Sequence, residues 1–309
     1  MSVDNKKHSV TTITQLMESR GSETVTAKIM NDETPDNSGL HTSSKVTESA
    51  DAGALNKDSK KVSILDKLLA NNMLVPGSDI DRRIQDDYRR VKRPLVANAC
   101  GRNRSMVERG NIILVTSSMP GEGKTYTSVN LALSISQEMD TTVLLVDCDV
   151  AKQGVSRVLG LENVCGLVDV LESDDLSIGD VLLKTDIPNF SVVSAGKQHE
   201  YVAELLASQR MSDLVNELAS RYSDRVVIFD GPPLLATPQT QVLAGLVGQV
   251  VFVVEAGKTP QSLVEEALDM IPEEQATGML LNKNQGLSRN GYSYYGYYGS
   301  EKNKSEDST

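Results

Sequence analysis

A glycine-rich turn between a β-branched run and a helical stretch carries the residue types that bind phosphate. The segment Ile112–Thr125 ends in Pro-Gly-Glu-Gly-Lys-Thr, and helical periodicity follows over Thr127–Met139. Glycines let backbone N–H groups approach phosphate oxygens, and a helix N-terminus adds partial positive charge. Lys124 would then reach the β- and γ-phosphates, and the Thr125 hydroxyl would reach Mg²⁺. The expected nucleotide-binding residues around the turn are Pro120, Gly121, Glu122, Gly123, Lys124, Thr125 and Tyr126.

This turn departs from the general phosphate-loop pattern at one position. Ser118 stands where the pattern has its first glycine. The alternative interpretation is a glycine turn that merely caps an ordinary helix. Strand, turn and helix nevertheless follow one another in the order that phosphate binding needs. The sequence therefore predicts a nucleotide site.

Aspartates follow two further apolar runs. Asp147 and Asp149 come after the run 143–146, and Asp230 comes after the run 226–229. Carboxylates gathered near a phosphate-binding lysine repel one another unless a cation compensates them, and Mg²⁺ prefers carboxylate and phosphate oxygens. Aspartates after strands also serve as helix caps, which is the alternative interpretation. We expect Thr125, Asp149 and Asp230 to organise Mg²⁺ and Cys148 to be a packing residue.

The last apolar run ends in Leu-Leu-Asn-Lys, with Asn282 and Lys283 as its final residues. Asn-Lys can begin a guanine-reading motif, but that motif wants an aspartate at position 285, where a glutamine stands. Adenine is therefore the expected base, with Asn282 near it.

A cluster of phenols lies close to the C-terminus. Five of the nine tyrosines are Tyr292, Tyr294, Tyr295, Tyr297 and Tyr298. Taken alone, this stretch would be a low-complexity tail. If the last strand runs parallel to the first, however, it delivers the tail to the rim of the glycine loop. We therefore expect these tyrosines to reach the nucleotide site of their own chain or of a neighbour, as substrates.

The elements that must position these residues alternate between apolar runs and helical stretches from about residue 111. Runs that are apolar on every side, separated by helices, predict a parallel sheet covered on both faces, the doubly wound α/β fold. Ligands in such sheets bind beyond the carboxyl ends of the strands. The expected strands are 112–116, 143–146, 190–194, 226–229, 250–254 and 279–281, and the expected helices include 203–218, 238–246 and 261–270.

The chain divides into four predicted segments. Residues 1–60 form a polar tail that we expect to be disordered, because its composition buries too little apolar surface. Residues 61–110 form a helical extension, residues 111–285 the nucleotide-binding domain, and residues 286–309 a flexible tyrosine-bearing tail. Within the extension we expect a short helix over 62–73 and a charged helix over 80–93 that Pro94 ends.

Composition excludes several function classes. The 309-residue chain has a net charge of −11, which argues against binding to nucleic acid or to anionic lipid. Its three cysteines have no metal or disulfide spacing, which favours a reducing cytosol. The sequence shows no apolar run near the ~20 residues of a membrane helix. We expect a cytoplasmic protein that reaches a membrane only through a partner.

With these residues in place, the chain resembles the bacterial tyrosine autokinases (BY-kinases) of capsule and exopolysaccharide loci. It is similar to their soluble branch, in particular to kinases of exosortase-associated polysaccharide clusters. Four motifs occur in the family's order. Residues 118–125 resemble its Walker A loop, 143–149 its Asp-x-Asp motif, 227–233 its Walker B motif and 292–298 its terminal tyrosine cluster. The resemblance also implies a P-loop NTPase fold like that of MinD and ParA.

The helix before the domain bears on assembly. Asp87, Arg90 and Arg93 resemble the family's Glu-x-x-Arg-x-x-Arg helix, which joins subunits into a ring. The alternative is a solvated helix with weak local ion pairs. Three departures from the family pattern stand out: Asp87 replaces a glutamate, Ala151 and Lys152 stand where an arginine often follows, and Cys148 takes the usual place of an alanine.

The resemblance implies transfer of a phosphoryl group from MgATP to tail tyrosines of a neighbouring subunit. The catalytic residues would be Lys124, Asp147, Asp149 and Asp230, with Asp147 accepting or orienting the phenolic proton. Implied partners are copies of the chain, a transmembrane polysaccharide co-polymerase as activator, and sugar-nucleotide enzymes or glycosyltransferases as further substrates. Two rivals remain open: an ATPase switch of the MinD/ParA class, which places a lysine where Met119 stands, and a noncatalytic adaptor that uses ATP to set its assembly state.

Overall fold

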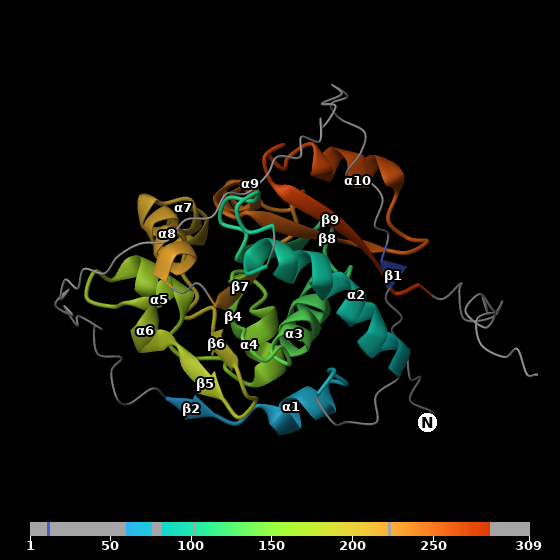
Figure 1. Cartoon of the computed structure of the whole chain (residues 1–309). Helices are drawn as coiled ribbons and strands as arrows, with labels where there is room; N and C mark the ends of the chain where they lie inside the picture. The colour runs from blue at the N-terminus through green and yellow to red at the C-terminus, as the bar shows by residue number, and fades with distance from the viewer. Residues whose placement is uncertain (1–10, 13–59, 76–81, 102, 222–223, 285–309) are drawn as a thin grey trace, which may run out of the picture.

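The computed structural model describes residues 11–12, 60–75, 82–101, 103–221 and 224–284. A nine-stranded sheet runs through it in the order β1-β9-β8-β3-β7-β4-β6-β5-β2 (Figure 1). The six strands from β9 to β6 are mutually parallel, whereas β5 is antiparallel to β6 and β1 is antiparallel to β9. The predicted doubly wound, mostly parallel α/β fold is confirmed.

The strands are β1 (Thr11–Thr12), β2 (Lys61–Val62), β3 (Ile112–Ser117), β4 (Thr142–Asp147), β5 (Leu183–Thr185), β6 (Phe190–Val193), β7 (Arg225–Asp230), β8 (Gln249–Glu255) and β9 (Ala276–Asn282). The helices are α1 (Leu65–Ala70), α2 (Arg82–Ala99), α3 (Lys124–Ile135), α4 (Gly154–Leu159), α5 (Leu167–Glu172), α6 (Ile178–Val181), α7 (Val202–Leu206), α8 (Gln209–Arg221), α9 (Gln239–Leu246) and α10 (Gln261–Leu268). All six expected strands are present, and the expected helix over 203–218 is divided into α7 and α8.

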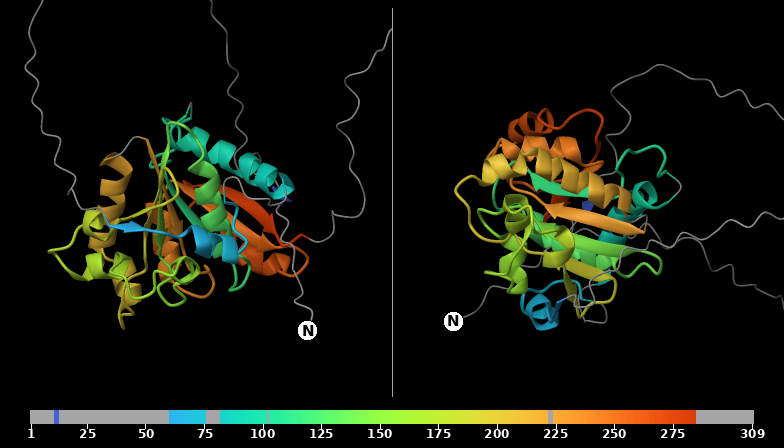
Figure 2. Two further views of the ribbon diagram at one scale, coloured as in Figure 1. Left: turned by 90° about the horizontal axis from the view of Figure 1, so that it is seen from below. Right: turned by 90° about the vertical axis from the view of Figure 1, so that its left-hand side faces the viewer.

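Successive residues of the central strands enter two separate hydrophobic cores, one on each face of the sheet. In β3, Ile113 and Val115 pack with helices α1 to α4, whereas Ile112 and Leu114 pack with helices α5 to α10. Figure 2 shows the sheet between these helical layers. Burial on both faces explains why the strands read as continuous apolar runs.

The strand that leads to the tyrosine cluster runs in the direction that the argument above requires. β9 pairs in parallel with β8, and β8 pairs in parallel with β3. The last residue of β9, Asn282, therefore lies at the same rim of the sheet as the glycine loop that follows β3. The predicted tail itself, residues 286–309, lies outside the described residues.

The prediction that Pro94 ends the charged helix is wrong, because α2 continues through Pro94 to Ala99. Proline removes the hydrogen bond to the carbonyl four residues earlier, that of Arg90. Arg90 and Pro94 both lie on the exposed face, so water can satisfy that carbonyl. On the opposite face Val91, Leu95 and Ala99 are buried in the core, and this packing offsets the loss.

Lys92 fastens the same helix to α3. Its Nζ donates to the backbone oxygen of Ser134 at 2.6 Å and lies 2.7 Å from a carboxylate oxygen of Glu138. Figure 1 shows α2 lying alongside α3, the helix that begins at the glycine loop. The N-terminal extension is therefore joined directly to the nucleotide-binding element.

The segments before α2 differ in detail from the expectation. The helix expected over 62–73 is shorter, from Leu65 to Ala70, and it buries Leu68 while Leu65 and Leu69 stay exposed. Within the expected disordered tail, Thr11–Thr12 pair with Leu280 and Leu281 at the edge of the sheet. The rest of residues 1–59 lies outside the described part of the chain. No helix in the described ranges is long and apolar enough to cross a membrane.

Candidate active site

The glycine loop closes β3 onto the first turn of α3, as predicted. Gly121 and Gly123 have φ angles of +92° and +100°, in the left-handed region that favours glycine. α3 begins at Lys124, directly after Gly123 as its N-cap. The helix N-terminus and its lysine therefore face the space that the loop encloses, which is the arrangement of an anion site.

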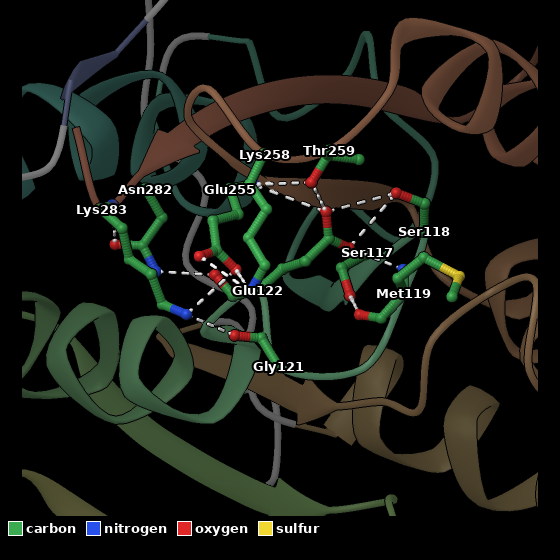
Figure 3. Close-up of polar contacts among 10 residues, drawn as sticks. All are labelled: Ser117, Ser118, Met119, Gly121, Glu122, Glu255, Lys258, Thr259, Asn282 and Lys283. Carbon is green, nitrogen blue, oxygen red and sulfur yellow. Dashed lines mark hydrogen bonds and ion pairs between the residues drawn. The ribbon is translucent and has the colours of Figure 1, made fainter.

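The side chain of Glu122 accepts hydrogen bonds that stabilise this loop. One carboxylate oxygen accepts from the backbone N–H of Met119 at 2.6 Å and from the hydroxyl of Ser118 at 3.2 Å, and the other contacts the hydroxyl of Thr259 (Figure 3). Glu122 is only 2% exposed. Ser118, which replaces the usual glycine, thus acquires a role as a donor to this buried carboxylate.

Asn282 and Lys283 join the end of β9 to the outside of the same loop (Figure 3). The Asn282 amide donates to the backbone oxygen of Glu122 at 2.8 Å, and Lys283 Nζ donates to that of Gly121 at 2.6 Å. Lys283 also pairs with Glu255 at 3.1 Å. The structure therefore brings Asn282 to the phosphate loop, and the proposed contact of Asn282 with an adenine base stays a prediction.

Asp230, the last residue of β7, faces the first turns of α3. It accepts hydrogen bonds from the hydroxyls of Thr125 at 2.7 Å and Ser128 at 2.8 Å. Thr125 and Asp230 were both predicted site residues, and the structure places them in contact. Ser128 was not predicted, although its position one helical turn after Lys124 was the available signal.

Asp147 ends β4 beside Asp230 and also contacts the first turn of α4. One of its oxygens accepts from the backbone N–H and the hydroxyl of Ser156 in α4, each at 2.8 Å. Its other oxygen, Oδ1, is buried and has no hydrogen-bond partner among the described residues. Asp147 therefore satisfies a donor in the first turn of α4, although the N-cap residue of that helix is Gln153, and its second oxygen remains available for a ligand. Ser156 was not predicted.

The electrostatics of the rim follow from burial. Desolvation raises the pKa of Asp147 to about 7, and the nearby charge of Asp230 adds to the shift. Desolvation likewise raises the pKa of Asp230 to about 6 against the hydrogen bonds from Thr125 and Ser128. Burial lowers the pKa of Lys124, and Asp230 and Asp149 oppose that shift. Burial of these carboxylates at one rim therefore favours their protonated forms.

Asp149 is buried at the same rim and borders a pocket of about 340 Å³. Its neighbour Cys148 belongs to the core on the α8 side of the sheet, which confirms the prediction that it is a packing residue. Burial raises the pKa of the Cys148 thiol well above its usual range. Tyr126, a predicted nucleotide-binding residue, turns its side chain toward the N-terminal extension, where its hydroxyl donates to the Asn72 oxygen at 3.5 Å.

The residues at this rim suit MgATP. The loop and Lys124 provide phosphate donors, and Thr125, Asp149 and Asp230 provide the hard oxygen ligands that Mg²⁺ prefers. Asp147 Oδ1, which is buried and has no partner in the described ranges, lies at the same rim. In the described part of the chain, no three His, Cys, Asp or Glu side chains form a metal site by themselves. A magnesium ion here would therefore depend on oxygens of Thr125 and of the phosphates.

The predicted assembly residues lie on α2. Arg90 and Arg93 are exposed, and Asp87 is half-buried. This exposure fits both a contact between subunits in a ring and a solvated helix, so both interpretations stay predictions. The predicted phosphoacceptors Tyr292–Tyr298 lie outside the described residues.

Comparison with known proteins identifies relatives of the whole domain. A family model described as "AAA domain" matches residues 110–271. Tyrosine-protein kinase YwqD of Bacillus subtilis (strain 168) is 33% identical over 193 residues, covering 62% of this chain and 78% of that protein. Tyrosine-protein kinase wzc of Salmonella typhimurium is 33% identical over 195 residues, but the match covers only 26% of its length.

Solved structures agree with this result. The crystal structure of the VpsO kinase domain has a TM-score of 0.55 at 27% identity and covers 66% of this chain and 98% of that one. The kinase domain of Escherichia coli tyrosine kinase ETK, at 24% identity, has the same fold with a TM-score of 0.57, covering 75% of this chain and 84% of that one. This P-loop fold implies ATP binding. The chain therefore belongs to the matched AAA-domain family and, within it, to the bacterial tyrosine-protein kinases.

Proposed function

We propose that this chain is an ATP-dependent tyrosine autokinase that phosphorylates the cluster Tyr292–Tyr298. The observation that carries this proposal is the contact between the end of β9 and the phosphate loop, made by Asn282 and Lys283. The chain continues from there toward the tyrosines, so phenols are tethered next to the expected position of ATP. The names of the relatives support the same activity.

In the proposed reaction, the phenolic oxygen forms a bond to the γ-phosphorus. The bond from that phosphorus to the β,γ-bridging oxygen breaks, and ADP leaves with the electron pair. Lys124 and the loop amides hold the phosphates. Thr125, Asp149 and Asp230 would hold a magnesium ion, which would neutralise charge on the phosphates. The phenolic proton goes to Asp147, whose pKa near 7 suits a general base. Because Asp147 is fully buried, we expect the rim to rearrange when substrates bind.

Mass spectrometry of the full chain expressed in a heterologous host and incubated with MgATP tests the activity. We expect phosphate on residues 292–298 of the wild-type chain and none in Lys124→Met. Lys184→Met, which removes an exposed lysine of β5 away from the loop, is the matched control. Full autophosphorylation by Lys124→Met would refute the kinase assignment. ATP hydrolysis without phosphotyrosine would favour the MinD/ParA-type switch, and ATP binding without either reaction would favour the adaptor.

We further propose that transfer occurs between subunits. A Lys124→Met chain with an intact tail would be mixed with an active chain whose five tail tyrosines are phenylalanine. Phosphate on the Lys124→Met chain is the expected result. Its absence, with normal autophosphorylation of the wild type, would assign the reaction to a single chain.

The proposed biological role is control of exopolysaccharide or capsule polymerisation and export, by an exosortase-associated kinase in the cytoplasm. Full phosphorylation of five tyrosines would add roughly −8 to −10 charges at neutral pH. A tail so charged would be repelled by the carboxylates of the rim, so phosphorylation would release a ring that unmodified tails hold together. Light scattering before and after ATP addition tests this, and an assembly that keeps its mass would refute it. The expected activator is a transmembrane polysaccharide co-polymerase, and sugar-nucleotide enzymes or glycosyltransferases are expected further substrates.

A further inference from the structure

Helix α2 carries a row of exposed arginines in an acidic chain. The net charge of the chain is −11, yet α2 exposes five guanidinium groups. They belong to Arg82, Arg83, Arg89, Arg90 and Arg93. On the opposite face of the helix, Val91 and Leu95 are buried in the core. α2 therefore presents a basic surface, and its apolar face is already covered by its own chain.

Two of these arginines are available to a partner. Arg89 pairs with the carboxylate of Asp86 at 2.8 Å. No carboxylate of the described residues pairs with Arg90 or Arg93. Residues three positions apart in a helix lie on the same face, ~4.5 Å apart along the axis. Arg90 and Arg93 therefore form a pair of neighbouring guanidinium groups without a counter-charge of their own.

The chemistry of this pair favours a phosphorylated peptide. Guanidinium groups bind phosphate through two parallel hydrogen bonds, which gives both strength and orientation. A lipid surface suits α2 less well, because helices that bind membranes insert an apolar face, and here that face is buried. The net charge of −11 likewise opposes binding to a nucleic acid. A short segment that carries several phosphates has the local charge that this surface complements.

The chain that leads to the tyrosines begins near α2. The short strand β1 pairs with Leu280 and Leu281 of β9 and also contacts α2. β9 ends at Asn282, so the end of β9 and α2 both lie next to β1. The chain from Asn284 to Tyr292 spans up to ~29 Å when extended. This reach is comparable with the ~27 Å length of the 18-residue helix α2.

Phosphorylation changes the charge of the tyrosine segment from neutral to strongly negative. Residues 291–299 carry no charged side chain, and phosphate on all five tyrosines adds roughly −8 to −10 charges. In an extended segment, alternate residues such as Tyr292 and Tyr294 lie on the same side, ~7 Å apart. The long side chains of Arg90 and Arg93 can adjust to this spacing. Only the phosphorylated segment therefore has charges that match α2.

We propose that the face of α2 with Arg90 and Arg93 binds the phosphorylated segment Tyr292–Tyr298 of this chain or of a second copy. This inference rests on the proposed kinase function and adds the surface to which the product tail moves. The carboxylates of the rim repel the phosphorylated tail, whereas the two guanidinium groups attract it. Because the same arginines are the predicted contacts between subunits, the bound tail competes with assembly.

Fluorescence anisotropy with two synthetic peptides of residues 291–299 tests the binding. One peptide carries phosphate on all its tyrosines, and the other carries none. The protein is the full-length chain with its five tail tyrosines replaced by phenylalanine, so it has no phosphorylated tail of its own. We expect the phosphopeptide to bind, with a Kd that rises with salt concentration, and the unmodified peptide not to bind.

The arginines are tested in this same chain. Arg90→Ala/Arg93→Ala should raise the Kd for the phosphopeptide about tenfold or more, and Arg90→Lys/Arg93→Lys should restore part of the affinity. Arg89→Ala is the matched control, because Arg89 is exposed on the same helix but already pairs with Asp86. The phosphopeptide should also lower the mass of the assembly in light scattering. An assembly that keeps its mass with the peptide bound would overturn the competition.

Three results would separate this proposal from the kinase proposal. Absence of phosphopeptide binding, or equal binding by Arg90→Ala/Arg93→Ala, would overturn the α2 site and leave the kinase proposal intact, because the phosphate of the peptide is introduced chemically. Binding of phosphatidylglycerol vesicles without binding of the phosphopeptide would identify a lipid surface as the partner and overturn the site. Absence of phosphotyrosine from the wild-type chain incubated with MgATP would overturn the kinase proposal, whatever the peptides show.

Discussion

Asp147 and Asp230 end adjacent parallel strands and are paired in register at the carboxyl rim of the sheet. Two carboxylates held side by side in a buried position cannot both ionise at little cost. Each forms compensating hydrogen bonds, Asp147 with Ser156 and Asp230 with Thr125. Burial still dominates, and the pKa values rise to about 7 and about 6.

This pair predicts that the chain without nucleotide loses stability as the pH rises from 5.5 to 8. The folded chain binds these protons more tightly than the unfolded chain, whose aspartates have a pKa of about 3.9. The stabilising contribution is therefore complete below that pH and is lost as the pH rises through about 6 and 7. Asp147→Asn should flatten the fall in melting temperature, as measured by differential scanning fluorimetry. Asp86→Asn, which removes an exposed carboxylate, should leave it unchanged, and an equally steep fall in Asp147→Asn would contradict the argument.

The contacts of Lys283, which directly follows β9, predict that this residue affects the affinity for ATP. Lys283→Met removes the contacts of Nζ with the Gly121 oxygen and with Glu255, so the phosphate loop loses an outer support. Hydrogen bonds of this kind contribute about 1 kcal/mol each, so we expect the Kd for ATP to rise about 3- to 10-fold in calorimetric titration. Lys258→Met is the control, because Lys258 also pairs with Glu255 but is far more exposed. If both substitutions raise the Kd for ATP equally, the effect comes from the lost ion pair with Glu255 and not from the lost contact with the Gly121 oxygen.

The fold and the positions of Lys124, Asp147 and Asp230 at the carboxyl rim were predictable, because they depend on patterns short enough to read along the chain. Strands buried on both faces give continuous apolar runs, and the ends of β3, β4 and β7 therefore identified Lys124, Asp147 and Asp230. The path of α2 through Pro94 was not predictable, because it depends on which face of that helix the core covers. A local rule about proline cannot include that information.

The supporting residues of the site were missed for a similar reason. Ser156 donates to Asp147 from α4, and the sequence pattern did not predict where that helix lies. Thr259 donates to Glu122 although the two residues are far apart in the sequence. The hydrogen-bond partner of a serine or threonine hydroxyl depends on where the fold places the residue. The residue type alone therefore did not predict these contacts. Lys283 was considered only as part of a guanine-reading motif, which the glutamine at position 285 argued against. Its contact with Gly121 could not be predicted without the register of β9 against β8.

Gly123 predicts a steric requirement at the start of α3. A Cβ at this position would lie 2.0 Å from the Asn282 amide nitrogen, and the φ angle of +100° would strain any other residue. Backbone strain of this kind costs of order 1–3 kcal/mol. Gly123→Ala should therefore lower the melting temperature and weaken ATP binding by about tenfold or more. Gly278→Ala in β9 is the control, because an added Cβ there meets no atom of the described part of the chain within 4 Å. ATP binding by Gly123→Ala at wild-type affinity would show that Asn282 does not constrain the loop.

Charge reversal at Arg90 and Arg93 tests whether α2 forms a contact between subunits. Both side chains are exposed, and the buried face of the helix is fixed to α3 through Lys92. If α2 joins subunits, the double variant Arg90→Glu/Arg93→Glu reverses two charges in the contact and should convert the assembly to single chains, as measured by light scattering. Arg89→Glu is the matched control, because Arg89 is also an exposed residue of α2 and pairs with Asp86. Since α2 and α3 are fixed together, the double variant should also slow phosphorylation between subunits without changing the Kd for ATP. An unchanged mass would establish the alternative, that the charged face of α2 is a solvated surface.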